Sequence, residues 1–179
     1  MYDDVEARIK RKNKVLFSYD SECLGGLLEL SRLQNRRVLV LWAFECVKIP
    51  LELVEEAFPD ETRPRIAYEQ CRLWAAGEIK MSQAKRAILD CHAVCREIDD
   101  AYYTALIHAV GQAVSTVHVG SHTMGLPFYE LTALVQKNRD NYREIIDRKI
   151  NYYIERMLYY QENEKNIAVK WADFLQRQP

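Results

Sequence analysis

The chain has 179 residues, of which 49% are hydrophobic and 28% charged, and its formal net charge is −1 at pH 7. A chain of this length folds most simply as one domain, with a core large enough to need no disulfide or metal staple. Its nearly neutral charge, with a pI near 6.4, gives no electrostatic footprint for binding nucleic acid or an acidic membrane surface.

The cysteines and the first residues bear on the compartment. Five cysteines are an odd number in a medium-sized chain, which argues against a disulfide framework. The opening stretch, MYDDVEARIKRKNK, is charged and lacks the apolar core of a signal peptide. We therefore expect a cytoplasmic protein with reduced thiols.

Residues 1–20 are expected to form an N-terminal arm, and residues 21–179 a helical domain. The arm carries a basic run followed by Val15, Leu16 and Phe17, so we interpret it as a charged segment that docks by its apolar end. Beyond it, apolar residues recur at helical spacing and no strand pattern is present. The expected helices cover 24–33, 36–47, 51–58, 64–77, 83–98, 101–123, 128–137, 142–160 and 167–175, the last being a short helix or a docked tail.

The stretch 101–129 contains no Asp, Glu, Lys or Arg. On a helix with ~100° per residue, its polar side chains share one narrow stripe and the rest of the circumference is apolar. Three histidines, Gln112 and several hydroxyls argue against a membrane span, which needs ~20 predominantly apolar residues. The pattern predicts an all-α, single-domain bundle around a buried central helix at about residues 101–123.

His118 and His122 are spaced i, i+4, which lets two imidazoles on one helix face reach one metal ion. A third ligand would have to come from another helix, and His92, Cys91, Cys95 and Glu130 are candidates. The alternative is that these histidines form hydrogen bonds inside the core, which we favour because two imidazoles are not a full ligand set. Zinc or another divalent metal is thus the one cofactor that the sequence suggests.

Other residues have structural and functional interpretations. Cys91 and Cys95 lie on the apolar side of their predicted helix, so buried packing is favoured over a reactive thiol. Arg63 and Arg65 at a helix start would hold an anion or tie down the turn through carboxylates, and we favour the tie.

The C-terminal region 142–177 is rich in tyrosine, a residue common at interfaces. Tyr153 and Tyr160 fall on the apolar face and are expected in the core. Tyr152 and Tyr159 lie one heptad apart on a neighbouring side. They are the candidates for an exposed aromatic, partner-binding patch, with ordinary packing as the alternative.

Three blocks occur in order along the chain. They are Trp42-Ala43-x-x-Cys46, then Arg63-Pro64-Arg65-x-Ala67 running to Leu73-Trp74-Ala75-x-Gly77-Glu78-Ile79, and then Gly111-Gln112-Ala113-Val114-x-Thr116-x-His118-Val119-x-x-His122-x-x-Gly125. As a set, over about residues 36–135, they resemble the bacterial putative immunity protein family of the type-five immunity-like group.

This resemblance implies an all-helical cytoplasmic protein that binds a cognate toxin and neutralises it, with a protein as partner. Because the sequence also contains no full catalytic set, we expect a binding protein rather than an enzyme. Trp42, Arg63, Arg65, Trp74, Gly111 and Gly125 would be its structural motif residues. Two alternatives stay open. One is a metal-binding helical-bundle enzyme that uses His118 and His122, and the other is a structural homodimer.

Overall fold

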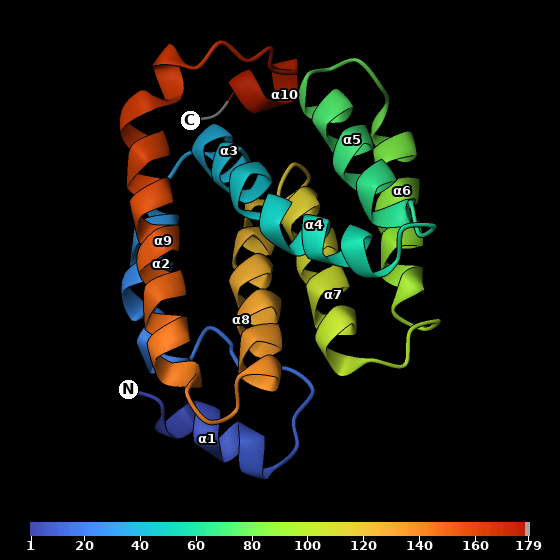
Figure 1. Ribbon diagram of the computed structural model, residues 1–179. Helices are drawn as coiled ribbons and strands as arrows, with labels where there is room; N and C mark the ends of the chain where they lie inside the picture. Colours follow the sequence, from blue (N-terminus) through green and yellow to red (C-terminus); the bar gives the residue numbers. More distant parts are fainter. Residues whose placement is uncertain (178–179) are drawn as a thin grey trace.

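Residues 1–177, which the computed structural model describes, form helices joined by short turns and contain no strand (Figure 1). The fold is all-α, as the apolar spacing predicts. The α-helices are α1 (Asp3–Lys10), α2 (Gly25–Arg32), α3 (Arg36–Cys46), α4 (Lys48–Ala57), α5 (Arg63–Ala75), α6 (Met81–Val94), α7 (Ala101–Ser115), α8 (Gly125–Lys137), α9 (Tyr142–Asn163) and α10 (Asp173–Gln176). Short 3₁₀ helices lie between them at η1 (Glu22–Leu24), η2 (Gly120–Met124) and η3 (Glu164–Asn166). Across the described part of the chain, no helix combines the length and the apolar character that crossing a bilayer requires.

Helix α7 is the centre of the fold. It packs against α3, α4, α5, α6 and α8. Asp100 caps its first turn, because the side-chain Oδ1 accepts a hydrogen bond from the backbone N–H of Tyr103 at 3.1 Å. The buried residues of α7 are Ala105, Leu106, Ile107, Ala109, Val110, Gly111, Ala113, Val114 and Ser115. The charge-free stretch therefore forms the buried axis that its composition predicts.

The central helix is shorter than the predicted range of 101–123, because α7 ends at Ser115 and a turn leads into η2. The hydroxyl of Ser115 donates to a carbonyl oxygen one turn earlier at 2.6 Å, and β-branched residues, which are weak helix formers, follow it. Arg36 of α3 donates from Nη1 to the carbonyl oxygens of Val117 at 3.2 Å and His118 at 2.7 Å. This arginine therefore holds the turn that follows the helix, and the spacing of apolar residues along the chain does not predict that contact.

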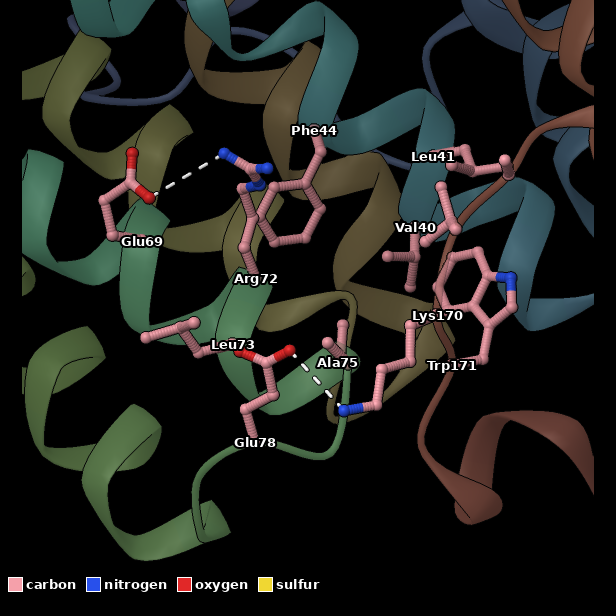
Figure 2. A pocket seen from close by; sticks show the side chains of 13 residues that line it. Val40, Leu41, Phe44, Glu69, Arg72, Leu73, Ala75, Glu78, Lys170 and Trp171 are labelled. Carbon is pink, nitrogen blue, oxygen red and sulfur yellow. Dashed lines mark ion pairs between the residues drawn. The ribbon is translucent and has the colours of Figure 1, made fainter.

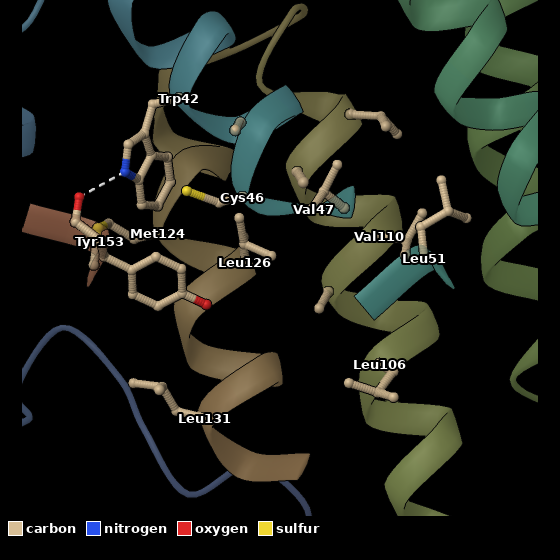
Figure 3. Close-up of a cluster of buried hydrophobic side chains, with 14 of the residues drawn as sticks. Trp42, Cys46, Val47, Leu51, Leu106, Val110, Met124, Leu126, Leu131 and Tyr153 are labelled. Carbon is tan, nitrogen blue, oxygen red and sulfur yellow. Dashed lines mark hydrogen bonds between the residues drawn. The ribbon is translucent and has the colours of Figure 1, made fainter. Parts of the chain in front are cut away.

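Helices α3, α8 and α9 form a second part of the core, on the side of α7 away from α5 and α6 (Figure 1). Trp42 of α3 is fully buried, and its Nε1 donates to the backbone oxygen of Tyr153 in α9 at 2.8 Å. The two rings lie 5.3 Å apart. Figure 3 shows this pair beside Leu126 and Leu131 of α8. Burying each of these large side chains stabilises the fold by roughly 1.5–3 kcal/mol.

The N-terminal arm docks onto the bundle. Val5, Leu16 and Phe17 are buried, and the backbone N–H of Leu16 donates to Oγ1 of Thr132 in α8 at 3.0 Å. The hydroxyl of Tyr2 donates to Oδ1 of Asp147 in α9 at 2.5 Å. The arm thus joins the same core through its apolar residues, while its basic residues reach solvent.

Residues 168–177, here called the C-terminal strap, fold back from α9 onto the end of α5 (Figure 1). The backbone N–H of Ala172 donates to the carbonyl oxygen of Ala75 at 2.7 Å. The ring of Phe174 stacks on Trp74, with centroids 5.2 Å apart and an interplanar angle of 29°. The strap therefore covers Trp74 and links the C-terminal end of α9 to the end of α5 (Figure 1).

Candidate functional site

The histidines of the chain lie at the interface of α6 with α7 and in the segment after α7. His92 of α6 rests on α7 at Gly111, where a Cβ atom would be 2.3 Å from its Cε1. Its Nδ1 lies 3.3 Å from Nδ1 of His108, and the His108 ring stacks on Tyr129 with centroids 4.8 Å apart. Burial, with smaller contributions from the nearby His108 and His122, lowers the pKa of His92 to about 4. These interior imidazoles are therefore neutral at pH 7.

His122 in η2 has a different partner. Its Nδ1 lies 2.8 Å from Oε1 of Gln112 in α7. Because an amide oxygen only accepts, His122 donates from Nδ1 and its Nε2 remains an acceptor. A Cβ atom at Gly125 would lie 2.6 Å from that same amide oxygen. The glycines at 111 and 125 thus make room for polar side chains between closely packed helices.

The expected metal pair, His118 and His122, does not share a helix face, because α7 ends before both residues. His118 is exposed, and its ring centroid lies 5.9 Å from that of Trp74. Within residues 1–177 no three His, Cys, Asp or Glu side chains form a group that could hold a metal ion. The pair stays a prediction from spacing, without the continuous helix on which that spacing depends.

Cys91 of α6 and Cys95, which follows the last residue of that helix, are free thiols. Cys91 is buried, and its Sγ donates to the carbonyl oxygen of Ile107 at 3.9 Å. Cys95 is half-buried, and its Sγ donates to the carbonyl oxygen of Thr104 at 3.7 Å. Burial raises the pKa of Cys95 to about 11 and that of Cys91 further. Neither group is a thiolate at neutral pH, so the arrangement favours packing over nucleophilic chemistry.

Arg63 and Arg65, at the start of α5, both pair with carboxylates of this chain. Nη2 of Arg63 lies 2.5 Å from Oε2 of Glu61 and 2.6 Å from Oε2 of Glu97. Arg65 makes a two-point contact with Glu55 of α4, with both N···O distances at 2.6 Å. These forks tie the start of α5 to α4 and to the segment before α7. The arrangement matches that of a structural tie, since both guanidinium groups are already paired.

The two tyrosines expected at a partner surface differ in exposure. Tyr159 is 44% exposed, and the guanidinium carbon of Arg156 lies 4.4 Å from its ring centroid. Tyr152 is half-buried; its pKa is raised to about 12, chiefly by burial. Nζ of Lys149 lies 5.0 Å from the Tyr152 ring centroid. Helix α9 therefore presents one exposed aromatic ring and one partly covered ring, each beside a cation.

An apolar groove, here called the α4–α8–α9 groove, lies between those three helices with a volume of about 300 Å³. Ile49 is 44% exposed at its edge. Lys137 holds its Nζ 4.9 Å from the ring centroid of Tyr102, so the groove has an apolar lining with cations at its rim. The lining residues are Ile49, Leu53, Tyr102, Leu106, Glu130, Leu134, Ile145, Arg148 and Lys149.

A buried ion pair lies at this groove. Glu130 of α8 is 2% exposed, and its Oε1 lies 2.6 Å from Nζ of Lys149 in α9. The hydroxyl of Tyr153, which is fully buried, donates to the other carboxylate oxygen. From the sequence, Glu130 was expected only as a candidate metal ligand, and neither of its two partners was predicted. The available signal was a single carboxylate in the otherwise uncharged run FYELTALV, which requires a partner once buried.

A second hollow, of about 390 Å³, lies between α3, α5 and the C-terminal strap. Figure 2 shows Phe44 and Trp171 among its lining residues. Two ion pairs cross or border it: Nη1 of Arg72 lies 3.7 Å from Oε2 of Glu69, and Nζ of Lys170 lies 3.5 Å from Oε1 of Glu78. The charged groups of this hollow thus pair with one another.

Comparison with known proteins places these features in context. The family model described as Imm-5 like putative immunity protein matches residues 29–156. That range is wider than the 36–135 of the resemblance, and it contains the α4–α8–α9 groove and all the histidines. The N-terminal arm and the C-terminal strap lie outside it. Searches of curated proteins and of solved structures gave no match.

Proposed function

Because the chain belongs to the Imm-5 like putative immunity protein family, we propose that it binds a cognate bacterial toxin and neutralises it without catalysing a reaction. The observation that carries this proposal is the family match over residues 29–156. Neutralisation by binding requires a surface that a protein partner can cover. The question is then which face of the bundle offers one.

In this proposal the toxin contacts the α4–α8–α9 groove and the adjoining face of α9. The groove offers about 300 Å³ lined mainly by apolar side chains, room for one or two anchoring side chains of a partner. Tyr159 and Arg156 lie on the same helix as the groove wall. Tyrosine and arginine are the residue types that most often dominate binding energy at interfaces, typically around a central apolar pocket.

The rim of the groove indicates the partner's chemistry. Lys137 stands over Tyr102. The side chain of Arg148 is 70% exposed, and its Nη2 lies 3.9 Å from Oε1 of the exposed Glu144 one turn earlier. Glu130 at the groove is already paired with Lys149. An apolar ridge flanked by carboxylates would fill this groove and meet its cations, and such complementarity also speeds association.

The test is co-expression with the toxin encoded by the gene next to this one. The unaltered protein restores growth and co-purifies with the toxin. Ile49→Arg places a charge in the groove mouth, where it repels the rim cations, and is expected to weaken binding about 30-fold or more. Ile66→Arg is the matched control, because Ile66 is the same residue type in another helix, α5, and is 46% exposed against 44% for Ile49.

The outcomes distinguish an error in the proposed function from an error in the proposed binding surface. If no neighbouring toxin is neutralised and no complex forms, the immunity function is wrong. If a complex forms but Ile66→Arg breaks it and Ile49→Arg does not, the function holds and the groove is the wrong face. A concentration-dependent dimer that Ile49→Arg dissociates would instead identify the groove as a surface for self-association.

A further inference from the structure

The C-terminal strap is fixed to the bundle through few of its side chains. Within residues 168–177 only Ala172 and Leu175 are buried. Val169 and Phe174 remain 42% and 41% exposed. Ordering a segment of this length costs conformational entropy, and the burial of two side chains offsets that cost only in part. We therefore expect the strap to detach more readily than any helix of the bundle.

The surface beneath the strap makes three kinds of contact with it. The backbone N–H of Ala172 donates at 2.7 Å to the carbonyl oxygen of Ala75, one of the last carbonyl groups of α5, which bonds within the helix do not satisfy. The ring of Phe174 stacks on Trp74 with centroids 5.2 Å apart. Leu175 is 1% exposed and joins the core. The surface thus holds a backbone amide, an aromatic ring and a branched aliphatic side chain at fixed spacing.

Two further contacts restrict the residues before the ring. Gly77 has a left-handed φ of +76°, and a Cβ atom there would lie 3.3 Å from Cβ of Ala172, so the strap needs a small residue at this point. Two residues earlier, Nζ of Lys170 lies 3.5 Å from Oε1 of Glu78 (Figure 2). The bound pattern is therefore a basic residue, a small residue two positions later, and an aromatic–aliphatic pair after one more position.

The strap does not fill the space that surrounds it. Hollows of about 390 Å³ and 630 Å³ flank it, and Figure 2 shows Trp171 in the first hollow among the apolar side chains of α3. The α3 and α5 residues beneath the strap lie within the family match over 29–156, whereas the strap lies outside it. The surface thus belongs to the matched core and has room for a bulkier segment than the strap.

We propose that this surface, here called the strap site, binds a segment of another protein in place of the strap. That segment carries the pattern of residues 170–175: basic, any, small, any, aromatic, aliphatic. The strap is then a tethered competitor, which keeps the site closed by its high effective concentration. The strap site shares no lining residue with the α4–α8–α9 groove, so the proposal is independent of the toxin contact.

The first test is hydrogen exchange of the full, unaltered chain. Backbone amides of the strap, including the hydrogen-bonded amide of Ala172, are expected to exchange at least about 100-fold faster than the buried amides of α7. Exchange of the Ala172 amide as slow as that of α7 would overturn the proposal, because the strap would then open only when the whole bundle unfolds.

The second test measures binding of a labelled peptide with the sequence of residues 167–177 to full-length variants, by fluorescence anisotropy. Phe174→Asp loses the stack on Trp74, and Leu175→Asp loses the buried anchor, so each loosens the strap. Each is expected to bind the peptide at least about tenfold tighter than the unaltered chain does. Leu158→Asp is the matched control, because Leu158 on α9 is 41% exposed, as Phe174 is, and it should bind no better than the unaltered chain.

The outcomes decide both the site and its occupant. Slow exchange of α7 amides in the variants shows that the bundle is intact, and no peptide binding by either loosened variant would overturn the proposal. Trp74→Ala added to Phe174→Asp should weaken binding about tenfold or more; unchanged affinity would place the peptide elsewhere and overturn the proposal. A concentration-dependent dimer of the unaltered chain with exchanged straps would assign the site to a second copy instead, and would overturn it as well.

Discussion

The ion pair at the groove gives the sharpest stability prediction. Lys149→Met keeps an unbranched side chain of similar length and removes the ammonium group that faces Glu130. The two charged atoms are 2.6 Å apart, and the side chains are 12% and 3% exposed. At an effective dielectric constant of ~20, the attraction across 2.6 Å is roughly 6 kcal/mol. That attraction is an upper limit on the stability lost in the variant. Burying the lysine ammonium group costs hydration energy, and the variant avoids this cost.

Measured cases give the magnitude, because breaking a buried ion pair by removing one partner costs about 3–5 kcal/mol. We therefore expect Lys149→Met to lower the free energy of unfolding by about 3–5 kcal/mol.

The assay is urea unfolding at pH 7, followed by tryptophan fluorescence. Lys149→Met combined with Glu130→Gln is the control, because the amide is neutral and its oxygen still accepts the hydrogen bond from the hydroxyl of Tyr153. This double variant should regain most of the lost stability. A loss below about 1 kcal/mol in the single variant, or no recovery in the double variant, would show that the pair is solvated and contributes little.

Three further predictions concern α7 and its neighbours. Val114→Asp places an unpaired charge in the core and should cost about 3 kcal/mol or more, whereas Val119→Asp, at a residue 39% exposed, should cost less than about 1 kcal/mol by the same urea assay. Gly111→Ala should lower the free energy of unfolding by about 1–2 kcal/mol, and with it the melting temperature, since the new Cβ displaces the His92 ring. Gly26→Ala is the control, because its new Cβ meets nothing within 4 Å, and it should be neutral or stabilising by up to about 1 kcal/mol. A larger loss in Gly26→Ala than in Gly111→Ala would contradict the packing of His92 on α7. Stability should fall as the pH drops from about 6.5 towards 4. The reason is that His92 takes up a proton in the unfolded chain but not in the folded one, where its pKa is lowered to about 4. Urea midpoints across this range should fall less steeply in His92→Gln, and an equal slope would show that His92 is not the group responsible.

The sequence predicts the bundle because burial imposes a regular spacing of apolar residues along each helix. The charge-free composition of 101–129 identifies α7 as the axis. The resemblance gives Gly111 and Gly125 as structural motif residues, and in the structure they leave room for the side chains of His92 and Gln112. The end of α7 could not be predicted in this way. The turn after α7 is held by Arg36, which lies far from it along the chain and reaches the carbonyl oxygens of Val117 and His118 only after folding.

The candidate sites were harder to predict, because their residues also come from parts of the chain that are far apart in sequence. His92 and His108 come from different helices, and only the packing of α6 on α7 brings their nitrogens together. Spacing along one helix pointed instead to His118 and His122, which have separate neighbours. Long-range pairing is invisible to local periodicity, whereas the exposed position of Tyr159 could be inferred from its place beside the apolar face of α9.

The central claim is that the α4–α8–α9 groove is the face that meets the toxin. Hydrogen exchange of the free protein and of its complex with the neighbouring gene's toxin tests it most directly. The account predicts that amides of α7 exchange slowly in both states, and that binding protects amides of α4, the C-terminal half of α8 and the adjoining part of α9. Protection that appears only around the start of α5 and the C-terminal strap, with the groove unchanged, would contradict it.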